Sequence, residues 1–151
     1  MAGLYYEDYS VDQEFEHDLS RTVTEMDNTM FSMLTINPQP LHIDAHFAEQ
    51  TEWGERLVNS FFTLGLLIGM TVYDTTLGTT IGNLGMSDVK FPKPVFHGDT
   101  LRAHTKIISV RESKSREDVG LVEFEHTATN QRDEVVAVCR RVAMMLKRSA
   151  A

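Results

Sequence analysis

The chain has 151 residues, 42% of them hydrophobic, and a formal net charge of -8 at pH 7. This length and apolar content are typical of one domain with one core, which we expect to span residues 1–151. The negative charge provides no general attraction for nucleic acid or for an anionic membrane surface, so neither is an expected partner. An anionic ligand would have to be met by a local basic cluster.

Cys139 is the only cysteine, which excludes an internal disulfide and a two-cysteine metal site and favours a cytoplasmic location. The amino terminus, MAGLYYEDYSVDQEFEHD, is acidic and lacks the basic start and apolar core of a signal peptide. The longest apolar segment, LVNSFFTLGLLIGMTVY, is interrupted by polar residues and is short for a membrane span. We therefore interpret it as a buried helix.

The first third of the chain predicts one strand followed by short helices. Residues 14–23 alternate imperfectly, as in a strand, and apolar residues then recur at helical spacing: Met26, Met30, Met33 and Leu34. This helix should end near Thr35, with Thr22 and Glu25 or Thr24 and Asp27 at its amino end. Two prolines make residues 36–42 a stiff loop, and DAHFAEQ adds a helical turn.

A long helix is predicted from Asn59 to Tyr73, because this segment is apolar almost all round and suits a helix enclosed by the domain. Gly65 and Gly69 lie one turn apart on it. They indicate a face that a sheet, a partner or a ligand approaches closely, and packing against the sheet is the simplest interpretation.

Four extended segments follow, at residues 79–91, 100–112, 119–129 and 134–147. One strand, short helices, one long helix and four further strands predict an α+β protein in which an antiparallel sheet wraps around the long helix, the hot-dog architecture. Such a sheet leaves edges uncovered, so we expect a homodimer, or a dimer-based oligomer, with a continuous sheet.

Two segments, NPQPLHID (37–44) and FPKPVFHGDTL (91–101), resemble the MaoC-like hot-dog family, which includes (R)-specific enoyl-CoA hydratases and dehydratases. The first, together with LVNSFFTLG, resembles the subgroup associated with mesaconyl-CoA or itaconyl-CoA. The resemblance implies reversible hydration of a short, branched or dicarboxylic enoyl-CoA thioester. It implies no cofactor, since coenzyme A is part of the substrate.

The resemblance also implies a catalytic pair, from which this chain departs. Hydrating members usually carry D-x-N-P-x-H, and alignment on His42 retains Pro40 but puts Gln39 at the asparagine and Asn37 at the catalytic aspartate. An amide orients water but does not exchange a proton near neutral pH. We therefore predict His42 as acid and base, because imidazole titrates near neutrality, and Asn37 as the residue that orients the water.

The charge that develops on the thioester oxygen calls for free N–H groups at the start of the long helix. The candidates there are Asn59, Ser60 and Phe61, and Gln39 joins them as a substrate-binding candidate. The family helix often opens with His-Gly, so Asn59 and Ser60 are a second departure. The Ser60 hydroxyl either contacts the ligand or caps the helix.

Each of these residues has a structural alternative. A lone histidine such as His42 is often structural, and Asp44, the alternative to the missing carboxylate, is more simply a helix cap. Asp99 is interpreted as a turn residue. The other histidines lack metal-ligand spacing, so no metal is predicted: His17, His46, His97, His104 and His126. Two basic groups could meet the phosphates of coenzyme A, and the choice stays open: Arg111, Lys114 and Arg116 of RESKSR, or Lys90 and Lys93.

Two other functions remain as alternatives to the hydratase. One is thioester hydrolysis, which hot-dog proteins usually perform with a carboxylate on the long helix, but no carboxylate lies between Val58 and Tyr73. The other is a non-catalytic acyl-CoA-binding or regulatory protein, in which Asn37 marks lost chemistry. Binding of acyl-CoA without turnover would identify this second case.

Overall fold

The computed structural model describes residues 3–150. Five strands and four helices follow in chain order: β1 (Glu14–Thr22), α1 (Glu25–Leu34), α2 (Pro40–Ile43), α3 (Ala45–Glu49), α4 (Ser60–Thr75), β2 (Thr80–Lys90), β3 (Thr100–Glu112), β4 (Val119–Thr129) and β5 (Val135–Leu146). Short 3-10 turns lie near the two ends, at Tyr6–Asp8 and Arg148–Ala150. The predicted strands and the long helix are confirmed to within one or two residues at their ends.

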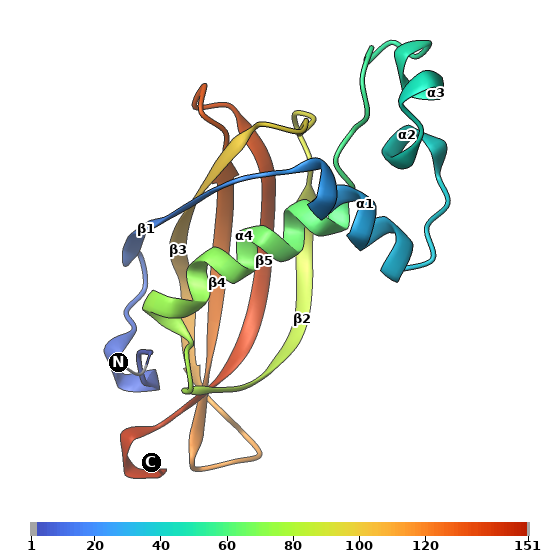
Figure 1. Ribbon diagram of the computed structural model, residues 1–151. Coiled ribbons are helices and arrows are strands. Elements are labelled where there is room, and N and C mark those ends of the chain that lie inside the picture. The colour runs from blue at the N-terminus through green and yellow to red at the C-terminus, as the bar shows by residue number, and fades with distance from the viewer. Residues whose placement is uncertain (1–2, 151) are drawn as a thin grey trace.

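The strands form one antiparallel sheet in the order β1-β3-β4-β5-β2. Helix α4 crosses one face of this sheet, and α1, α2 and α3 gather at its amino-terminal end (Figure 1). The predicted α+β arrangement of a sheet around one long helix is therefore confirmed. Among residues 3–150, no helix is long and apolar enough to cross a membrane.

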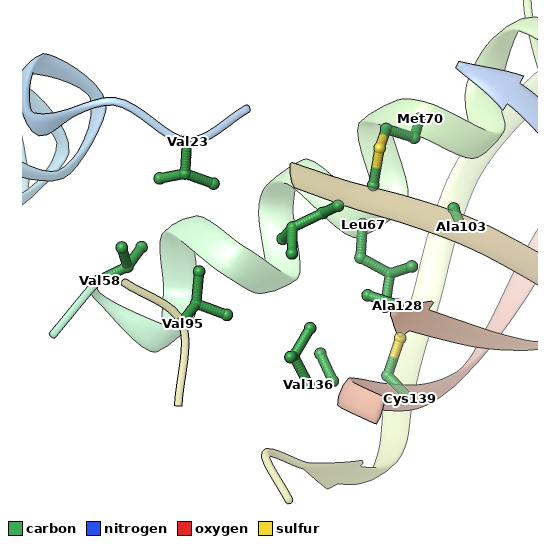
Figure 2. Packing of buried hydrophobic residues seen from close by; sticks show 11 residues of the cluster. Val23, Val58, Leu67, Met70, Val95, Ala103, Ala128, Val136 and Cys139 are labelled. Atoms are coloured by element: carbon green, nitrogen blue, oxygen red, sulfur yellow. The ribbon is translucent and has the colours of Figure 1, made fainter. Parts of the chain in front are cut away.

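The main core lies between α4 and the sheet. Along β5 every second residue is buried on the helix-facing side: Ala137, Cys139, Arg141, Ala143 and Met145. Leu67 and Met70 of α4 belong to the same cluster as Ala103, Ala128 and Cys139 (Figure 2). Complete burial of a leucine such as Leu67 contributes about 1.5–3 kcal/mol. The contacts in this cluster therefore hold α4 on the sheet.

Helix α4 is not enclosed all round, contrary to the sequence prediction. Phe61 is 69% exposed and Tyr73 is 52% exposed. A Cβ atom added at Gly65 or Gly69 would meet no atom within 4 Å, so the sheet does not approach these glycines. Within this chain α4 buries one face, and the interpretation of the glycines as a packing face against the sheet is wrong.

Helix α1 buries the face opposite to the one that its apolar spacing suggests. Met26, Met30 and Met33 are 68%, 53% and 61% exposed, whereas Asn28 and Ser32 are fully buried. Asn28 and Ser32 lie one turn apart and face the start of α4 through hydrogen bonds to Asn59. Packing of α1 thus depends on polar contacts that hydrophobic periodicity does not detect.

The ends of the short helices follow local chemistry. Thr24 and Asp27 form the capping box of α1, which was one of the two predicted pairs. Helix α2 begins at Pro40, so the stiff segment ends at Gln39 rather than at residue 42. Proline suits the first helical position because the N–H group that it lacks would have no partner there.

Candidate functional site

His42 lies in the single turn of α2, and backbone contacts tie this turn to the segment before α4. The Leu57 N–H donates to the Leu41 carbonyl at 3.1 Å. Two residues further, the Asp44 carboxylate accepts from the Phe47 N–H at 3.0 Å and caps α3. Asp44 therefore serves as the helix cap that the sequence suggested.

The His42 ring is held in one tautomer. Its Nδ1 atom lies 2.9 Å from the Leu57 carbonyl oxygen, and a carbonyl can only accept. The neutral ring therefore carries its proton on Nδ1 and a lone pair on Nε2. Within residues 3–150, Nε2 has no hydrogen-bond partner, and the residue is half-buried. A fixed ring with a free Nε2 is suited to accept and return a proton.

The start of α4 brings the predicted oxyanion residues together, but two of their N–H groups are already engaged. The Asn59 N–H donates to Asn28 Oδ1 at 2.8 Å, and the Phe61 N–H donates to Asn59 Oδ1 at 3.0 Å. The N–H group of exposed Ser60 lies between them and bonds to no other residue of the described chain. Of the three predicted residues, Ser60 is thus the one whose N–H remains available at the positive end of the helix dipole.

Asn37 and Gln39 form a local turn before α2. The Gln39 N–H donates to Asn37 Oδ1 at 3.1 Å, while the Gln39 side chain is exposed. In residues 3–150, no hydrogen bond joins Asn37 to His42. Asn37 does line a small cavity of about 190 Å³ with Ser32, Met33, Ile36, Pro38 and Ile43. Among residues 3–150 its NH2 group has no hydrogen-bond partner and can donate to a water.

A second cavity, of about 210 Å³, lies beside the start of α4. It is lined by Trp53, Leu57, Val58, Ser60, Thr63, Phe91, Pro92, Lys93, Pro94, Val95 and Val136. Leu57 connects it to His42, because the carbonyl of Leu57 accepts from the imidazole. Lys93 is the one charged residue of the lining. The cavity is therefore mostly apolar, as a site for a short acyl group requires.

The two basic groups lie at different ends of the molecule. The loop that holds RESKSR follows β3 and lies at the end of the sheet far from α2 (Figure 1). Arg116 in this loop is also paired with Asp118. Lys93, in contrast, lines the cavity beside Ser60. Of the second choice for a phosphate contact, Lys93 borders this cavity, whereas Lys90 borders a separate hollow beside β5.

His17 and His126 lie in a buried polar chain between α4 and the sheet. Asp74 Oδ2 is 2.9 Å from His17 Nδ1, and His17 Nε2 is 2.8 Å from Thr105 Oγ1. The same oxygen is 2.8 Å from His126 Nδ1, and Arg141 Nε donates to His126 Nε2 at 2.8 Å. Burial, followed by the charges of Arg141 and His17, holds the pKa of His126 well below its ordinary value.

Each of the remaining histidines has a polar side chain close to its ring. His46 Nε2 is 3.0 Å from Gln50, and His104 lies 3.5 Å from the Glu14 carboxylate. His97 contacts the Asn28 amide at 3.0 Å, and burial together with the Arg56 charge lowers the pKa of His97. Across residues 3–150, no three His, Cys, Asp or Glu side chains come together as a group that could hold a metal. Asp99 accepts from the Phe96 N–H within its own turn.

Asn28 belongs to the site, although no sequence pattern indicated it. Its side chain bonds to the backbone of His42, Leu57 and Asn59, at separations of 14 to 31 residues along the chain. Within α1 it stands among exposed methionines, a pattern that suggests a solvated position. Its role depends on buried hydrogen bonds between segments that are distant in the sequence, and sequence patterns do not reveal such bonds.

This architecture defines a hot-dog protein. A double-hotdog protein from Mycobacterium tuberculosis, 22% identical, shares the fold with a TM-score of 0.85 over 96% of this chain. A putative MaoC domain dehydratase from Chloroflexus aurantiacus superposes with a TM-score of 0.90 at 31% identity, over 97% of this chain and 41% of its own. A monoamine oxidase regulatory protein from Archaeoglobus gives 0.86 at 30% identity, with 97% of both chains covered.

Within this fold class, the chain belongs to the MaoC-like domain family, whose model matches residues 8–130. It is 31% identical over 150 residues to a mesaconyl-CoA hydratase of Cereibacter sphaeroides and 32% identical over 146 residues to a β-methylmalyl-CoA dehydratase of Chloroflexus aurantiacus. These matches cover 99% and 97% of this chain but 43% and 41% of the relatives. The chain therefore spans about two fifths of the length of these relatives.

Proposed function

We propose that this chain is a hydratase and dehydratase that adds water reversibly to the double bond of an enoyl-CoA thioester, a carbon-oxygen lyase. One observation carries the proposal: the Nδ1–H of His42 is committed to the Leu57 carbonyl, and its Nε2 is free close to the start of α4. The names of the relatives in the same family support this type of reaction. The whole chain, residues 1–151, acts as one hot-dog unit.

In the proposed reaction, His42 Nε2 takes one proton from a water whose oxygen bonds to the β-carbon of the substrate. The electrons of the double bond move toward the thioester carbonyl, and the Ser60 N–H donates to the oxygen that gains negative charge. The imidazolium then returns the proton to the α-carbon, so that H and OH have been added in total. Dehydration is the reverse, and no cofactor takes part.

Asn37 supports the water in this proposal. Because Asn37 Oδ1 is engaged by the Gln39 N–H, the amide holds the water by donation from its NH2 group, and His42 alone moves protons. Asn59 and Phe61 shape the start of α4, and Gln39 contacts the substrate from the turn. The substrate we propose is a short, branched or dicarboxylic thioester of the mesaconyl-CoA or itaconyl-CoA type, with Lys93 as the cation nearest the cavity.

The assembly we propose is a homodimer, or an oligomer built from dimers, in the cytoplasm. Helix α4 leaves Phe61 and Tyr73 exposed, and edge strand β2 exposes four apolar side chains: Ile81, Leu84, Met86 and Val89. A second copy that pairs with β2 would cover both surfaces. Leu84→Glu should therefore shift the mass measured by light scattering to that of the monomer. Leu19→Glu, on the opposite edge strand β1, is the matched control and should leave the mass unchanged.

The test of the reaction is a spectrophotometric hydration assay with crotonyl-, mesaconyl- and itaconyl-CoA. Wild type, His42→Ala and Asn37→Asp are compared, with circular dichroism as the control for folding. We expect turnover of a branched dicarboxylic thioester that falls by a factor of about 10²–10⁴ in His42→Ala, the usual contribution of general acid-base catalysis.

Two other outcomes would replace the proposal. Absence of turnover in wild type, with acyl-CoA binding in calorimetry and activity gained by Asn37→Asp, would identify a non-catalytic binding protein. Release of free coenzyme A without hydration would identify a thioesterase. The first carboxylate on α4 is Asp74 near its carboxyl end, where it is bonded to His17, and this position does not favour hydrolysis at His42.

A further inference from the structure

Asn28 is a fully buried amide whose side chain joins three separate parts of the site. Its Oδ1 accepts from the Asn59 N–H at 2.8 Å. Its Nδ2 donates to the carbonyl oxygens of His42 at 3.0 Å and Leu57 at 2.9 Å. The same nitrogen lies 3.0 Å from His97 Nε2. Burial of an amide is costly unless it is bonded, so this set of contacts fixes the side chain in one orientation.

These contacts act on both the position and the tautomer of the His42 ring. Asn28 binds the backbone carbonyl of His42 and also the Leu57 carbonyl, which is the acceptor of the His42 Nδ1–H. The amide thereby holds the histidine backbone and its ring partner at a constant distance from each other. A shift of Leu57 by a fraction of an ångström would release Nδ1–H and allow the other tautomer.

The same amide is also connected to the two N–H groups that flank Ser60 at the start of α4. Asn28 Oδ1 takes the Asn59 N–H, and Asn59 Oδ1 in turn takes the Phe61 N–H. The Ser60 N–H remains between two engaged donors. One buried side chain thus connects the proton-transferring ring with the donor for the thioester oxygen.

Few side chains could replace this amide. Asn28 faces three acceptors with its NH2 group and one donor with its oxygen, and asparagine alone combines two N–H donors and an acceptor at this length. An aspartate has the same shape, but it would place a second oxygen against the two carbonyl oxygens. A leucine would leave the His42 carbonyl and the Asn59 N–H unpaired.

We infer that Asn28 is a positioning residue for the reaction, which keeps His42 in the Nδ1–H tautomer and aligns its Nε2 with the Ser60 N–H. This inference rests on the proposed function for its kinetic consequence, but its structural consequence can be measured without any substrate. Asn28 itself lines neither cavity, so its loss should affect the chemical step more than substrate binding.

The experiment compares wild type with Asn28→Asp and Asn28→Ala. Asn130→Asp is the matched control, since Asn130 is also a fully buried asparagine, bonded within the turn between β4 and β5. The ring tautomer of His42 is read from ¹⁵N chemical shifts at neutral pH, and kcat and KM are measured for hydration. Folding is followed by circular dichroism.

We expect kcat to fall by about 10²-fold in both Asn28 variants, the cost of a misplaced catalytic group, with KM changed less than twofold. The His42 ring should change from the Nδ1–H tautomer to a mixture, whereas Asn130→Asp should change neither kcat nor the tautomer. Unchanged tautomer in folded Asn28 variants, or a loss of kcat no larger than that of Asn130→Asp, would overturn the inference.

Two further results keep this inference separate from the proposed function. If wild type shows no turnover, the proposed function fails, while the tautomer comparison still decides the role of Asn28. If neither Asn28 variant folds, coupling across hydrogen bonds is measured in wild type, from Asn28 Nδ2 to the carbonyl carbons of His42 and Leu57. Coupling to both supports the inference, and absence of both overturns it.

Discussion

A histidine network lies at each end of helix α4. The two networks differ in the hydrogen bonds that the ring nitrogens make. At the amino end, His42 gives Nδ1–H to the Leu57 carbonyl and keeps Nε2 free. At the carboxyl end, both nitrogens of His17 and both nitrogens of His126 have partners inside the protein. A ring that is half-buried with one free nitrogen can do chemistry, whereas a ring with two internal partners holds structure.

The second network has a fixed direction. A guanidinium can only donate, so Arg141 Nε–H requires a lone pair on His126 Nε2 and a proton on its Nδ1. His126 then donates to Thr105, whose hydroxyl donates to His17, and His17 donates to Asp74. This series of hydrogen bonds connects the buried cation of Arg141 to the carboxylate of Asp74, across four strands and α4. It specifies how these elements are aligned, and both nitrogens of each ring are occupied.

The largest effect that would separate the two networks is expected from His126→Leu. This change leaves the buried Arg141 Nε–H without its hydrogen-bond acceptor, and it should lower the free energy of unfolding by about 3 kcal/mol or more, because the unpaired donor is charged. Urea denaturation measures the loss. The kcat per folded molecule should remain within twofold of wild type, and a kcat loss as large as that of His42→Ala would mean that the two networks are not separate.

A smaller loss is expected from Thr105→Val, which keeps the shape and removes the hydroxyl between the two rings. One acceptor on His17 and one donor on His126 lose their partner, at a cost of about 1–3 kcal/mol. Thr22→Val removes a hydroxyl pair with Thr100 on the exposed side of the sheet and should cost less. Equal losses in urea denaturation would contradict a special role of the buried chain.

The smallest of these effects should be the change in the free energy of unfolding per pH unit. The pKa of His126 is lowered in the folded protein, so below its unfolded value near 6.5 the unfolded chain binds a proton that the native protein does not. The free energy of unfolding therefore falls as the pH falls from 6.5 toward 5, by at most about 1.4 kcal/mol per pH unit for this group.

His97 contributes in the same direction, because burial and Arg56 lower its pKa as well. Denaturation curves from pH 5 to 7 should show this slope in wild type and a smaller slope in His126→Leu. The exposed His46 is the control, and His46→Gln should leave the slope unchanged. An identical slope in wild type and His126→Leu would exclude His126 as its source.

The sequence predicted the sheet and the long helix because their signals are local. Strand β5 alternates for its whole length, and the apolar run of α4 has no competing pattern. Asp44 and Thr24 were also identifiable, since each directly precedes a helix and caps it by accepting from the N–H group three residues later. The expectation that α4 is enclosed was wrong, because an apolar helix can equally leave a face open for a second chain.

The polar interior could not be predicted in the same way. The buried face of α1 consists of Asn28 and Ser32, whose partners lie 14 to 69 residues along the chain, while the apolar Met26 and Met30 are exposed. His17 and His126 likewise meet only through Thr105, after three strands have paired. His42 was found through its motif, but its tautomer depends on the Leu57 carbonyl, which no spacing reveals.

The most direct test of the account compares the two histidine networks in one assay. Hydration of mesaconyl-CoA is measured for wild type, His42→Ala and His126→Leu, with each rate divided by the folded fraction from circular dichroism. We expect His42→Ala to lose at least a factor of about 10² in rate, while His126→Leu stays within twofold of wild type. Full activity in folded His42→Ala would contradict this expectation.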